Sequence, residues 1–438
     1  MNVSAMDSPC LDVAGIGAGP FNLSVAALLA PLVEVRSAFF ERRPRFAWHP
    51  GMMLPGAKLQ TSFLKDLVTA ADPTSAYSFL AYLVAHGRFY RFLNAEFGAI
   101  ERREFADYLQ WVAGRLPNLL LGHEVREVQF DGDGFVLHGD GQRHRARNLV
   151  VATGATPYVP EWAPARLMCL HTHQYLERIG NVDGLRIAVV GGGQSGAEVV
   201  LDLLSGTRGQ AAAITWLSRR QTFEALDETA FINEFFTPHY VDAFHRLHPG
   251  RKAAIVARQK LASDGISRDT LTQLYQTLYM DSMVRGEGSL LRLLPHRDVH
   301  AMEADSAGAW RLTAHNGFDG GHDVVDADLV ILATGYLTRL PDCLAPLHDR
   351  LDLDADGRYR LQRDFSVQWD GPAANGIYVQ NAGRHSHGIA EPQLSLAAWR
   401  GAVIANAILG HARYATGDAA LPIEWASGSG EAAIDKAA

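Results

Sequence analysis

Two glycine-rich stretches of the chain have the residue types and spacing that hold phosphate groups. The first, VAGIGAGPFNLS near the N-terminus, places Gly15, Gly17 and Gly19 directly before Pro20. Glycines let a backbone approach a pyrophosphate closely, and the helix that follows offers free N–H groups and a partial positive charge. Glu41 ends the next predicted strand, where a carboxylate can accept hydrogen bonds from the ribose of an adenosine. An ordinary strand–turn–helix is the alternative, but the matching acid favours a dinucleotide site.

The second stretch, VVGGGQSGAEVV, matches the dinucleotide-binding pattern more completely. The residues that we expect to bind phosphate in this turn are Gly191, Gly193, Gln194, Ser195 and Gly196.

The end of the following strand distinguishes the two sites. Ser218, Arg219 and Arg220 stand where an acid is expected. A carboxylate would repel a 2′-phosphate, whereas arginines and a hydroxyl bind one through charge-assisted hydrogen bonds. A solvated basic edge is the alternative. We therefore predict FAD at the first turn and NADPH at the second.

A chain with both sites is typical of a flavin enzyme that a pyridine nucleotide reduces. A disulfide reductase needs a redox cysteine pair, but Cys10, Cys169 and Cys343 lie far apart and form no C-x-x-C. An amine or amino-acid oxidase needs only one dinucleotide site, and a flavin-binding regulator or a structural protein need not keep the second. The pattern favours a monooxygenase, in which NADPH reduces FAD before O2 adds.

The elements that position these residues alternate between strands and helices, which predicts an α/β fold. Each turn lies between a short apolar strand and a helix. Two later strands end in Ala-Thr-Gly, at 152–154 and 333–335, and are predicted to carry the chain between the two nucleotide domains. The fold class is therefore α/β, with two Rossmann-like dinucleotide-binding domains, for FAD and NADPH, and a small helical substrate-binding insertion.

The predicted domains are discontinuous, and each has its own range of residues. They are an FAD-binding domain (1–160 and 325–420), an NADPH-binding domain (161–222 and 286–324), a helical substrate-binding insertion (223–285) and a disordered tail (421–438).

Composition excludes several other classes of protein. The 438 residues are 47% hydrophobic and 20% charged, with a net charge of -8 and no run of lysines or arginines, which argues against a nucleic-acid partner. No signal peptide or membrane span is evident, so a cytoplasmic protein is expected. The 18 histidines form no H-E-x-x-H or comparable cluster, so no metal is expected.

Four longer motifs carry a resemblance to a known family: residues 46–83, 219–240, 333–336 and 385–400. They resemble the flavin N-hydroxylating monooxygenases of siderophore biosynthesis, with the greatest similarity to L-lysine N6-monooxygenases of the aerobactin type. The resemblance extends over nearly all of residues 11–412. It implies FAD, NADPH, a C4a-hydroperoxyflavin and O2-dependent hydroxylation of the side-chain amine of L-lysine. A diamine, putrescine or cadaverine, is the alternative substrate, and L-ornithine is less favoured.

The resemblance also implies roles for individual residues. Gln60 resembles a glutamine that lies against the flavin, and Lys65 a catalytic-site lysine that pairs with the substrate's α-carboxylate. A surface ion pair near Asp66 is the alternative for Lys65. Trp48 and His49 resemble residues near the isoalloxazine.

Other implied residues lie further along the chain. Asn233 matches a substrate-binding asparagine, and Ser263 stands, as in lysine enzymes, where ornithine enzymes have another asparagine. The remaining implied residues are the substrate-binding Ser395 and the cofactor-binding Thr334, Gly335, Tyr336 and His387, with His385 in the same motif.

The reaction requires a neutral amine, because a protonated one has no lone pair to attack with. A free lysine amine has a pKa of about 10.4, so the pocket must favour its neutral form. The sequence identifies no proton acceptor. Relatives also suggest a homo-oligomer, a dimer or a tetramer.

Overall fold

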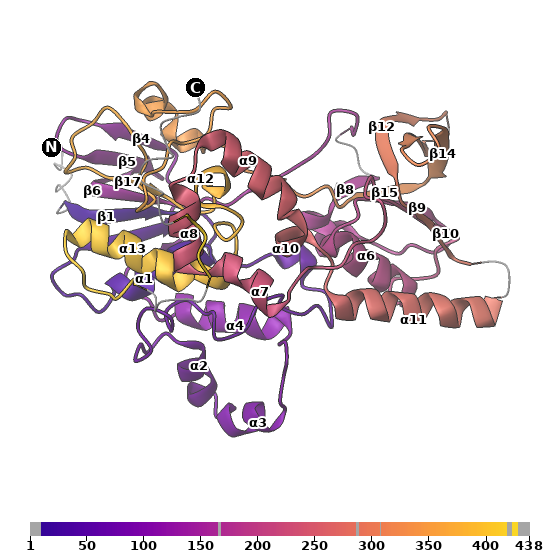
Figure 1. Ribbon diagram of the computed structural model, residues 1–438, viewed down its shortest axis with the longest axis horizontal. Coiled ribbons are helices and arrows are strands. Elements are labelled where there is room, and N and C mark those ends of the chain that lie inside the picture. Colours follow the sequence, from indigo (N-terminus) through magenta and orange to yellow (C-terminus); the bar gives the residue numbers. More distant parts are fainter. Residues whose placement is uncertain (1–9, 165–167, 286–288, 307, 418–422, 428–438) are drawn as a thin grey trace, which may run out of the picture.

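The computed structural model describes residues 10–164, 168–285, 289–306, 308–417 and 423–427. Two sheets lie side by side in an elongated molecule, with helices between and below them (Figure 1). The predicted tail lies outside the described residues except for 423–427, where Trp425 packs 4.9 Å from the ring of Tyr240. No helix in the described ranges is long and apolar enough to cross a membrane.

The first sheet has the strand order β3-β2-β1-β6-β5-β4, with β17 beside β6. Strands β1, β2, β3, β6 and β17 run parallel, so their carboxyl ends meet at one edge, where open α/β sheets bind ligands. The strands are β1 (Leu11–Ile16), β2 (Ser37–Glu41), β3 (Leu119–Leu121), β4 (Glu127–Phe130), β5 (Phe135–Gly139), β6 (Gln142–Val151) and β17 (Ile377–Val379).

Helix α1 (Pro20–Leu29) follows the first glycine turn, and every one of its residues is buried. Pro20 occupies the first helical turn, where its missing N–H leaves no hydrogen bond unmade. The helix is buried on all sides because α13 (Ala397–Leu409) and α4 (Arg102–Ala113) cover the faces that the sheet does not. This packing fixes the N-terminus of α1 at the carboxyl edge of the sheet.

The second sheet is entirely parallel, with the order β11-β10-β9-β15-β8. Its strands are β8 (Cys169–His171), β9 (Arg186–Val190), β10 (Ala213–Leu217), β11 (Leu291–Leu294) and β15 (Leu329–Leu332). Helix α6 (Gln194–Leu204) begins directly after the second glycine turn. The predicted α/β fold with two Rossmann-like sheets is therefore confirmed, whereas the predicted domain boundaries stay a prediction.

A three-stranded antiparallel sheet, which the sequence pattern did not predict, covers one face of the second sheet. It consists of β12 (Arg297–Ala304), β13 (Trp310–Asn316) and β14 (His322–Ala327). Its buried side chains, Trp310, Leu312 and Val325 among them, share a core with Leu217 and Val330.

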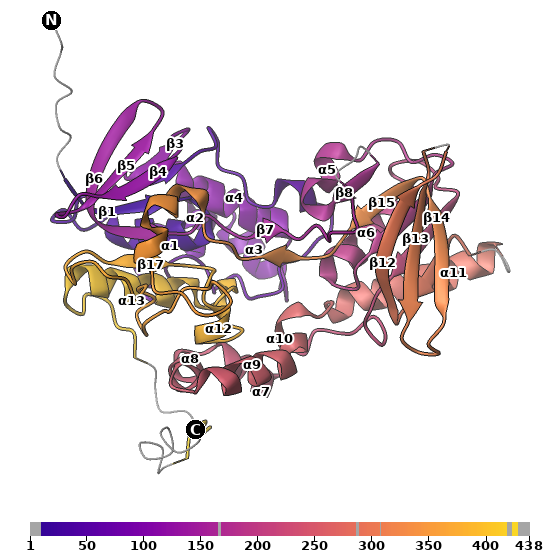
Figure 2. The same ribbon diagram turned by 90° about the horizontal axis from the view of Figure 1, so that it is seen from above.

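Two crossovers join the halves, and they pair with one another. Strand β7 (Thr156–Pro157) follows the first Ala-Thr-Gly and β16 (Tyr336–Leu337) the second, in an antiparallel ribbon between the sheets (Figure 2). The chain passes from β6 through β7 to β8, and returns from β15 through β16 to β17. The predicted crossovers are confirmed.

The segment from 223 to 285 is helical and contacts both halves. Helix α11 packs against α6, whereas α8 and α9 contact α12. The helices of this segment are α7 (Ala230–Asn233), α8 (Pro238–His245), α9 (Pro249–Arg258), α10 (Lys260–Asp264) and α11 (Arg268–Arg285). The other α-helices are α2 (Phe79–Ala85), α3 (Phe89–Asn94), α5 (Tyr175–Arg178) and α12 (Arg384–His387), and short 3₁₀ helices span Pro50–Met52, Thr172–Gln174, Glu234–Phe236, Asp342–Arg350 and Leu394–Leu396.

Candidate functional site

A cavity of about 2340 Å³ lies between the two sheets and the helical segment. Both glycine turns line it, through Gly19 and Pro20 on one side and residues 191–195 on the other. Pockets for a single small ligand are commonly 300–1,000 Å³. The cavity therefore has room for more than one ligand.

The glycines of the first turn fall into two kinds. A Cβ on Gly15 would lie 2.0 Å from the Phe39 ring, and one on Gly17, at φ +83°, would lie 2.6 Å from the carbonyl oxygen of Ala152. These two glycines allow strand and turn to pack. Gly19 has φ -68° and no heavy atom within 4 Å of a built Cβ, so its backbone faces open space in the cavity. A phosphate can approach the start of α1 there.

Glu41 is fixed at the end of β2 by the backbone of the turn. Its Oε2 accepts a hydrogen bond from the N–H of Ala18 at 2.9 Å, and its Oε1 accepts one from the N–H of Arg43 at 3.0 Å. The cavity wall at this point consists of Arg42 and Arg43 rather than Glu41 itself. The carboxylate therefore holds the turn beside the space predicted for the adenosine.

A buried polar network, for which the sequence pattern gave no prediction, runs from Asn22 in α1 to Glu391. The side-chain amide of Asn22 donates to the carbonyl oxygen of Gly17 at 2.7 Å, and Gln380 donates to Asn22 at 2.9 Å. Arg400 donates to Gln380 at 3.3 Å and pairs with Glu391 at 3.1 Å, with both side chains 1% exposed. The network fixes the first turn from below. Glu391 and Arg400 belong to the motif at 385–400, which was the signal available in the sequence.

The glycines of the second turn are also of two kinds, those in close contact with other backbone atoms and one that faces the cavity. A Cβ on Gly191, at φ +126°, would lie 2.1 Å from the carbonyl oxygen of Ala333, and one on Gly196 would lie 2.3 Å from the carbonyl oxygen of Gly191. The indole N–H of Trp216 donates to that same Gly191 oxygen at 2.9 Å. Gly193, at φ -105°, has nothing within 4 Å of a built Cβ. It lines the cavity at the start of α6, with Gln194 and Ser195 in the same wall.

The predicted 2′-phosphate residues differ in their surroundings. Ser218 is buried, and its hydroxyl accepts a hydrogen bond from the N–H of Arg220 at 3.1 Å. Arg219 is exposed. Arg220 turns inward, and its Nη2 donates to the carbonyl oxygen of Asp264 at 2.8 Å. All three residues line the cavity.

Gln60 and Gln194 meet where the two halves approach each other. The amide nitrogen of Gln60 lies 3.4 Å from Oε1 of Gln194 and 3.5 Å from the carbonyl oxygen of Gly265. Gln194 donates to Glu198 at 2.9 Å, and Glu198 receives a bidentate pair of bonds from Arg102 at 2.7 and 3.1 Å. Both charged side chains are largely buried, at 6% and 15% exposure. This network joins α4 to α6 and fixes the two predicted glutamines.

Two predicted substrate residues lie away from the cavity wall. Lys65 does not line the cavity, and burial lowers the pKa of its ammonium below the usual value. The surface ion pair considered for Lys65 is not formed, because the carboxylate of Asp66 accepts bonds from Val68, Thr69 and Phe79 instead. Asn233 is exposed, and its amide donates only weakly to the carbonyl oxygen of Glu228, at 3.4 Å.

The other two lie in or beside the wall. Ser263 lines the cavity, and its hydroxyl lies 2.9 Å from Nη2 of Arg384. Ser395 lies one layer behind, with its hydroxyl 3.3 Å from that of Thr61, which does line the cavity.

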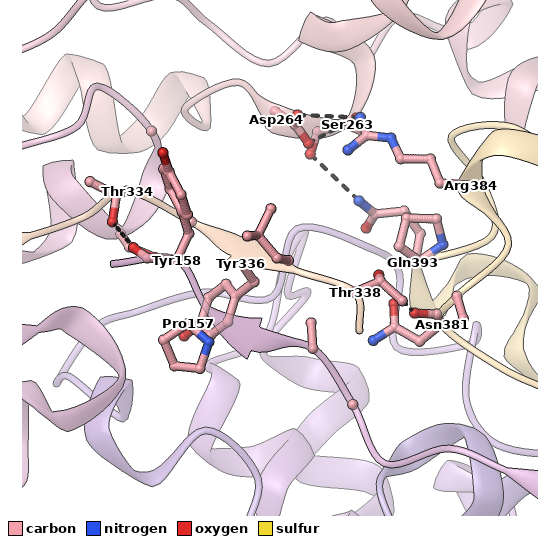
Figure 3. Close-up of a pocket in the computed structure, with 18 of the residues that line it drawn as sticks. Pro157, Tyr158, Ser263, Asp264, Thr334, Tyr336, Thr338, Asn381, Arg384 and Gln393 are labelled. Atoms are coloured by element: carbon pink, nitrogen blue, oxygen red, sulfur yellow. Dashed lines mark hydrogen bonds and ion pairs between the residues drawn. The ribbon is translucent and has the colours of Figure 1, made fainter. Parts of the chain in front are cut away.

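The aromatic residues predicted near the flavin form one part of the wall. Trp48, His49 and Tyr336 line the cavity, with ring centroids 5.3 Å apart for Trp48–His49 and 6.5 Å apart for His49–Tyr336. Thr334 and Gly335 continue the wall, and Thr334 donates to the carbonyl oxygen of Tyr158 across the crossover ribbon (Figure 3).

The two motif histidines have different positions. His387 is buried outside the cavity wall and stacks on Phe365 at 4.1 Å, and burial lowers its pKa well below the usual value. In this position its ring packs in the core behind the wall, and its predicted cofactor-binding role stays a prediction. His385 lines the cavity, with Nε2 2.8 Å from the carbonyl oxygen of Tyr359, and burial lowers its pKa as well.

Arg384, which no motif of the sequence marked as a site residue, joins the helical segment to the first half. Its Nη2 lies 2.9 Å from the hydroxyl of Ser263 and 3.3 Å from Oδ2 of Asp264, and the amide of Gln393 lies 3.5 Å from the carbonyl oxygen of Ser263. Figure 3 shows these four residues together on one side of the cavity, with Tyr158 and Thr334 on the other. Arg384 directly precedes His385 in the motif, but its partners are more than a hundred residues away.

Among the described residues, no three His, Cys, Asp or Glu side chains gather closely enough to hold a metal ion.

Comparison with known proteins gives one consistent family. The sequence profile of the family described as L-lysine 6-monooxygenase/L-ornithine 5-monooxygenase matches residues 9–338. The L-lysine N6-monooxygenase of Escherichia coli is 42% identical over 96% of this chain and 99% of its own. The FAD-bound cadaverine monooxygenase of desferrioxamine biosynthesis from Erwinia amylovora superposes with a TM-score of 0.89, at 31% identity over 96% of this chain and 100% of that one. An ornithine N-hydroxylase of Kutzneria sp. 744, solved with reduced FAD, NADP⁺ and L-ornithine, superposes with a TM-score of 0.85. It is 30% identical, over 92% of this chain and 99% of that one.

Proposed function

The chain belongs to the L-lysine 6-monooxygenase/L-ornithine 5-monooxygenase family, and on this premise we propose that it hydroxylates the side-chain amine of L-lysine for a hydroxamate siderophore. One amine, one O2 and one NADPH with a proton give one hydroxylamine, one water and NADP⁺. The observation that carries the proposal is that both glycine turns line one cavity. In each turn one glycine, Gly19 or Gly193, has no heavy atom within 4 Å of a built Cβ.

The first turn would hold FAD. The backbone at Gly19 and the start of α1 receive the pyrophosphate, and Glu41 holds the turn beside the adenosine. Trp48 and Tyr336 provide an apolar wall for the ring system. FAD, once reduced by NADPH, supplies the activated oxygen that is transferred to the amine.

The second turn would hold NADPH. Gly193 and the start of α6 face the pyrophosphate, and Arg219 and Arg220 provide the positive charge that a 2′-phosphate requires. The network of Arg102, Glu198 and Gln194 fixes α6 against the first half, which sets the distance between the two ligands.

The amine would bind where the predicted residues Gln60 and Ser263 line the cavity. Two cationic side chains, Arg384 and Lys260, line the same wall, and the carboxylate of Asp264 pairs with Arg384. Their positive charge favours the neutral over the protonated amine, which is the form that reacts. It also attracts an α-carboxylate, which favours an amino acid over a diamine.

A diamine, cadaverine or putrescine, is the second candidate substrate. It is favoured by the position of Lys65, which was predicted to pair with the α-carboxylate but does not line the cavity. It is also favoured by the TM-score of 0.89 with the cadaverine monooxygenase of Erwinia amylovora. Action in the cytoplasm and assembly as a dimer or tetramer remain predictions.

The test compares L-lysine, L-ornithine, cadaverine and putrescine side by side and measures the hydroxylamine product. Consumption of NADPH is not sufficient, since reduced flavin can also pass its electrons to O2 and release H2O2. The proposal expects the largest kcat/KM with L-lysine, and at least a tenfold lower value with cadaverine, equivalent to about 1.4 kcal/mol of transition-state binding. A larger kcat/KM with a diamine would make the enzyme a diamine N-hydroxylase, and no hydroxylamine from any of the four would reject the function.

A further inference from the structure

Arg220 connects the second glycine turn with the helical segment. Its Cδ lies 3.9 Å from where a Cβ on Gly192 would stand, and its Nη2 donates to the carbonyl oxygen of Asp264 at 2.8 Å. Its Nε is 3.8 Å from a carboxylate oxygen of Glu224. Its remaining terminal nitrogen, Nη1, is buried and has no hydrogen-bond partner among the described residues. A guanidinium presents its donors in a fixed plane, so a group bound at Nη1 would be held rigidly relative to Asp264.

The surroundings of Arg220 carry an excess of positive charge. Lys260 and Arg219 lie near it in the cavity wall, and Arg384 is close on the other side of Asp264. Burial is the largest cause that lowers the pKa of Lys260, and the nearby charges of Arg220 and Arg219 lower it further. Asp264 is already paired with Arg384. Arg220 lines the cavity with its side chain 15% exposed, so a guanidinium that has one unsatisfied donor lies in surroundings that fit an anion such as a phosphate monoester.

The segment that contains Asp264 also contributes to the predicted amine site, through Ser263 and through its contact with Gln60. We define the 263–265 segment as Ser263, Asp264 and Gly265. Arg384 binds the side chains of the first two, and the amide of Gln60 lies 3.5 Å from the carbonyl oxygen of the third. Figure 3 shows Ser263 and Asp264 at the cavity with Arg384 directed toward them. Any displacement of this segment would move residues from both halves of the molecule.

We propose that Arg220 is a positioning residue that couples the two sites. It binds the 2′-phosphate of NADP(H) through Nη1 while its Nη2 holds the 263–265 segment in the shape that receives the amine. Binding of NADP⁺ then strengthens binding of the amine substrate, and a nucleotide without the 2′-phosphate has no such effect. This proposal rests on the function proposed above and adds a reason why the enzyme uses NADPH, beyond affinity.

The expected coupling is moderate and reciprocal. Arg220 already contacts Asp264 without a nucleotide, so the phosphate adds order to an existing contact rather than creating a new one. Couplings between two ligand sites commonly amount to roughly fivefold or more in affinity, and each ligand must affect the other by the same factor. We therefore expect NADP⁺ to tighten substrate binding about fivefold, and the substrate to tighten NADP⁺ binding equally.

The experiment measures binding by calorimetry with the FAD-loaded, oxidised enzyme, in which no turnover occurs. The ligand is the amine with the highest kcat/KM in the comparison of four substrates. Its Kd is measured alone, with NADP⁺ and with NAD⁺, each nucleotide at the same fractional occupancy. The expected result is an about fivefold lower Kd with NADP⁺ and an unchanged Kd with NAD⁺. Equal Kd values under all three conditions would overturn the proposal. This result would not affect the proposed hydroxylation activity, which is measured separately.

Two arginine variants separate positioning from simple charge. Arg220→Gln should abolish the fivefold coupling even at full NADP⁺ occupancy. Arg219→Gln is the matched control, because Arg219 is exposed, whereas the side-chain hydrogen bond to the 263–265 segment comes from Arg220. It should weaken NADP⁺ binding but keep the coupling at equal occupancy. Coupling that survives in Arg220→Gln, or that is lost equally in both variants, would overturn the proposal.

A third variant covers the case in which Arg220→Gln disturbs the fold. Arg220→Lys retains the positive charge but has only one nitrogen, which cannot hold both groups in a fixed plane. It should bind NADP⁺ and still show no coupling. Hydroxylamine formation by the unaltered enzyme is measured in parallel. If the enzyme forms product but shows no coupling, only this inference fails, whereas absence of product means that the proposed function fails.

Discussion

Substitution of Gly19 or Gly193 by alanine should separate the two cofactor sites without harming the fold. Neither glycine needs a left-handed backbone, since their φ angles are -68° and -105°, and neither has a heavy atom within 4 Å of a built Cβ. Each is the N-cap of its helix, where alanine is less favourable than glycine by roughly 0.5–1 kcal/mol. Alanine also restricts the unfolded chain, which stabilises by about 0.4–1 kcal/mol. The two effects offset each other.

The expected change in stability is therefore within about 1 kcal/mol, or a Tm shift of no more than about 4 °C. Binding should change far more, because the added methyl points into the space where a pyrophosphate approaches the helix N-terminus. Loss of one charge-assisted hydrogen bond to a phosphate costs about 1.5–3 kcal/mol. At 1.4 kcal/mol per factor of ten, the Kd rises roughly 10- to 150-fold.

The assay titrates FAD-free protein with FAD by fluorescence and FAD-loaded protein with NADP⁺ by calorimetry. Gly19→Ala should weaken FAD alone, and Gly193→Ala should weaken NADP⁺ alone. Gly17→Ala is the contrasting variant, since φ +83° and a contact of 2.6 Å with Ala152 should destabilise the protein itself. Wild-type FAD affinity in Gly19→Ala, or exchange of the two effects between the sites, would refute the assignment of the turns.

Three other predictions concern buried ionisable groups. Arg400→Met leaves Glu391 buried without its cation and should lower the free energy of unfolding in urea by about 3–5 kcal/mol; a loss under about 1 kcal/mol would contradict this. A double-mutant cycle of Arg102→Met and Glu198→Met should give a coupling of about 1–3 kcal/mol in the same assay, and additive effects would show that the pair does not hold α4 to α6. His171 is 3% exposed, and burial, with a smaller contribution from His173, lowers its pKa to about 4. Between about pH 6.5 and pH 4 the unfolded state therefore binds a proton that the folded state does not, so the free energy of unfolding falls on acidification by up to about 3 kcal/mol. His171→Asn should reduce this dependence of stability on pH. An unchanged dependence would exclude His171 as its source.

The features that the sequence predicted well are local ones. Each glycine turn lies within a dozen residues of its strand and helix, and the spacing of Gly191, Gly193 and Gly196 is set by that short geometry alone. The two crossovers were predictable for a related reason, because each follows directly from a buried strand. The structure adds which glycines serve packing and which face the cavity, a distinction that depends on atoms such as the Ala333 carbonyl, far away in sequence.

The features that the sequence could not give depend on long-range contacts. Arg220 was predicted to bind phosphate, but its contact with Asp264 arises because α10 folds back over the end of β10. The structure places Lys65 outside the cavity wall, and the neighbouring Asp66 accepts a hydrogen bond from the N–H of Phe79, a contact that the sequence pattern does not show. Arg384 has no local feature that marks it, since its partners Ser263 and Asp264 come from another segment. The roles predicted for Lys65, Asn233 and Ser395 stay predictions.

The most direct test of the central claim follows the oxygen atom. FAD-loaded enzyme is supplied with NADPH, L-lysine and ¹⁸O2, and the product is analysed by mass spectrometry. We predict one ¹⁸O atom on the side-chain nitrogen, one NADPH oxidised for each hydroxylamine formed, and no label when the heavy isotope is supplied as water instead. Release of ammonia with an aldehyde, or NADPH oxidation that yields only H2O2 with all four amines, would contradict the assignment of this chain as an N-hydroxylating monooxygenase.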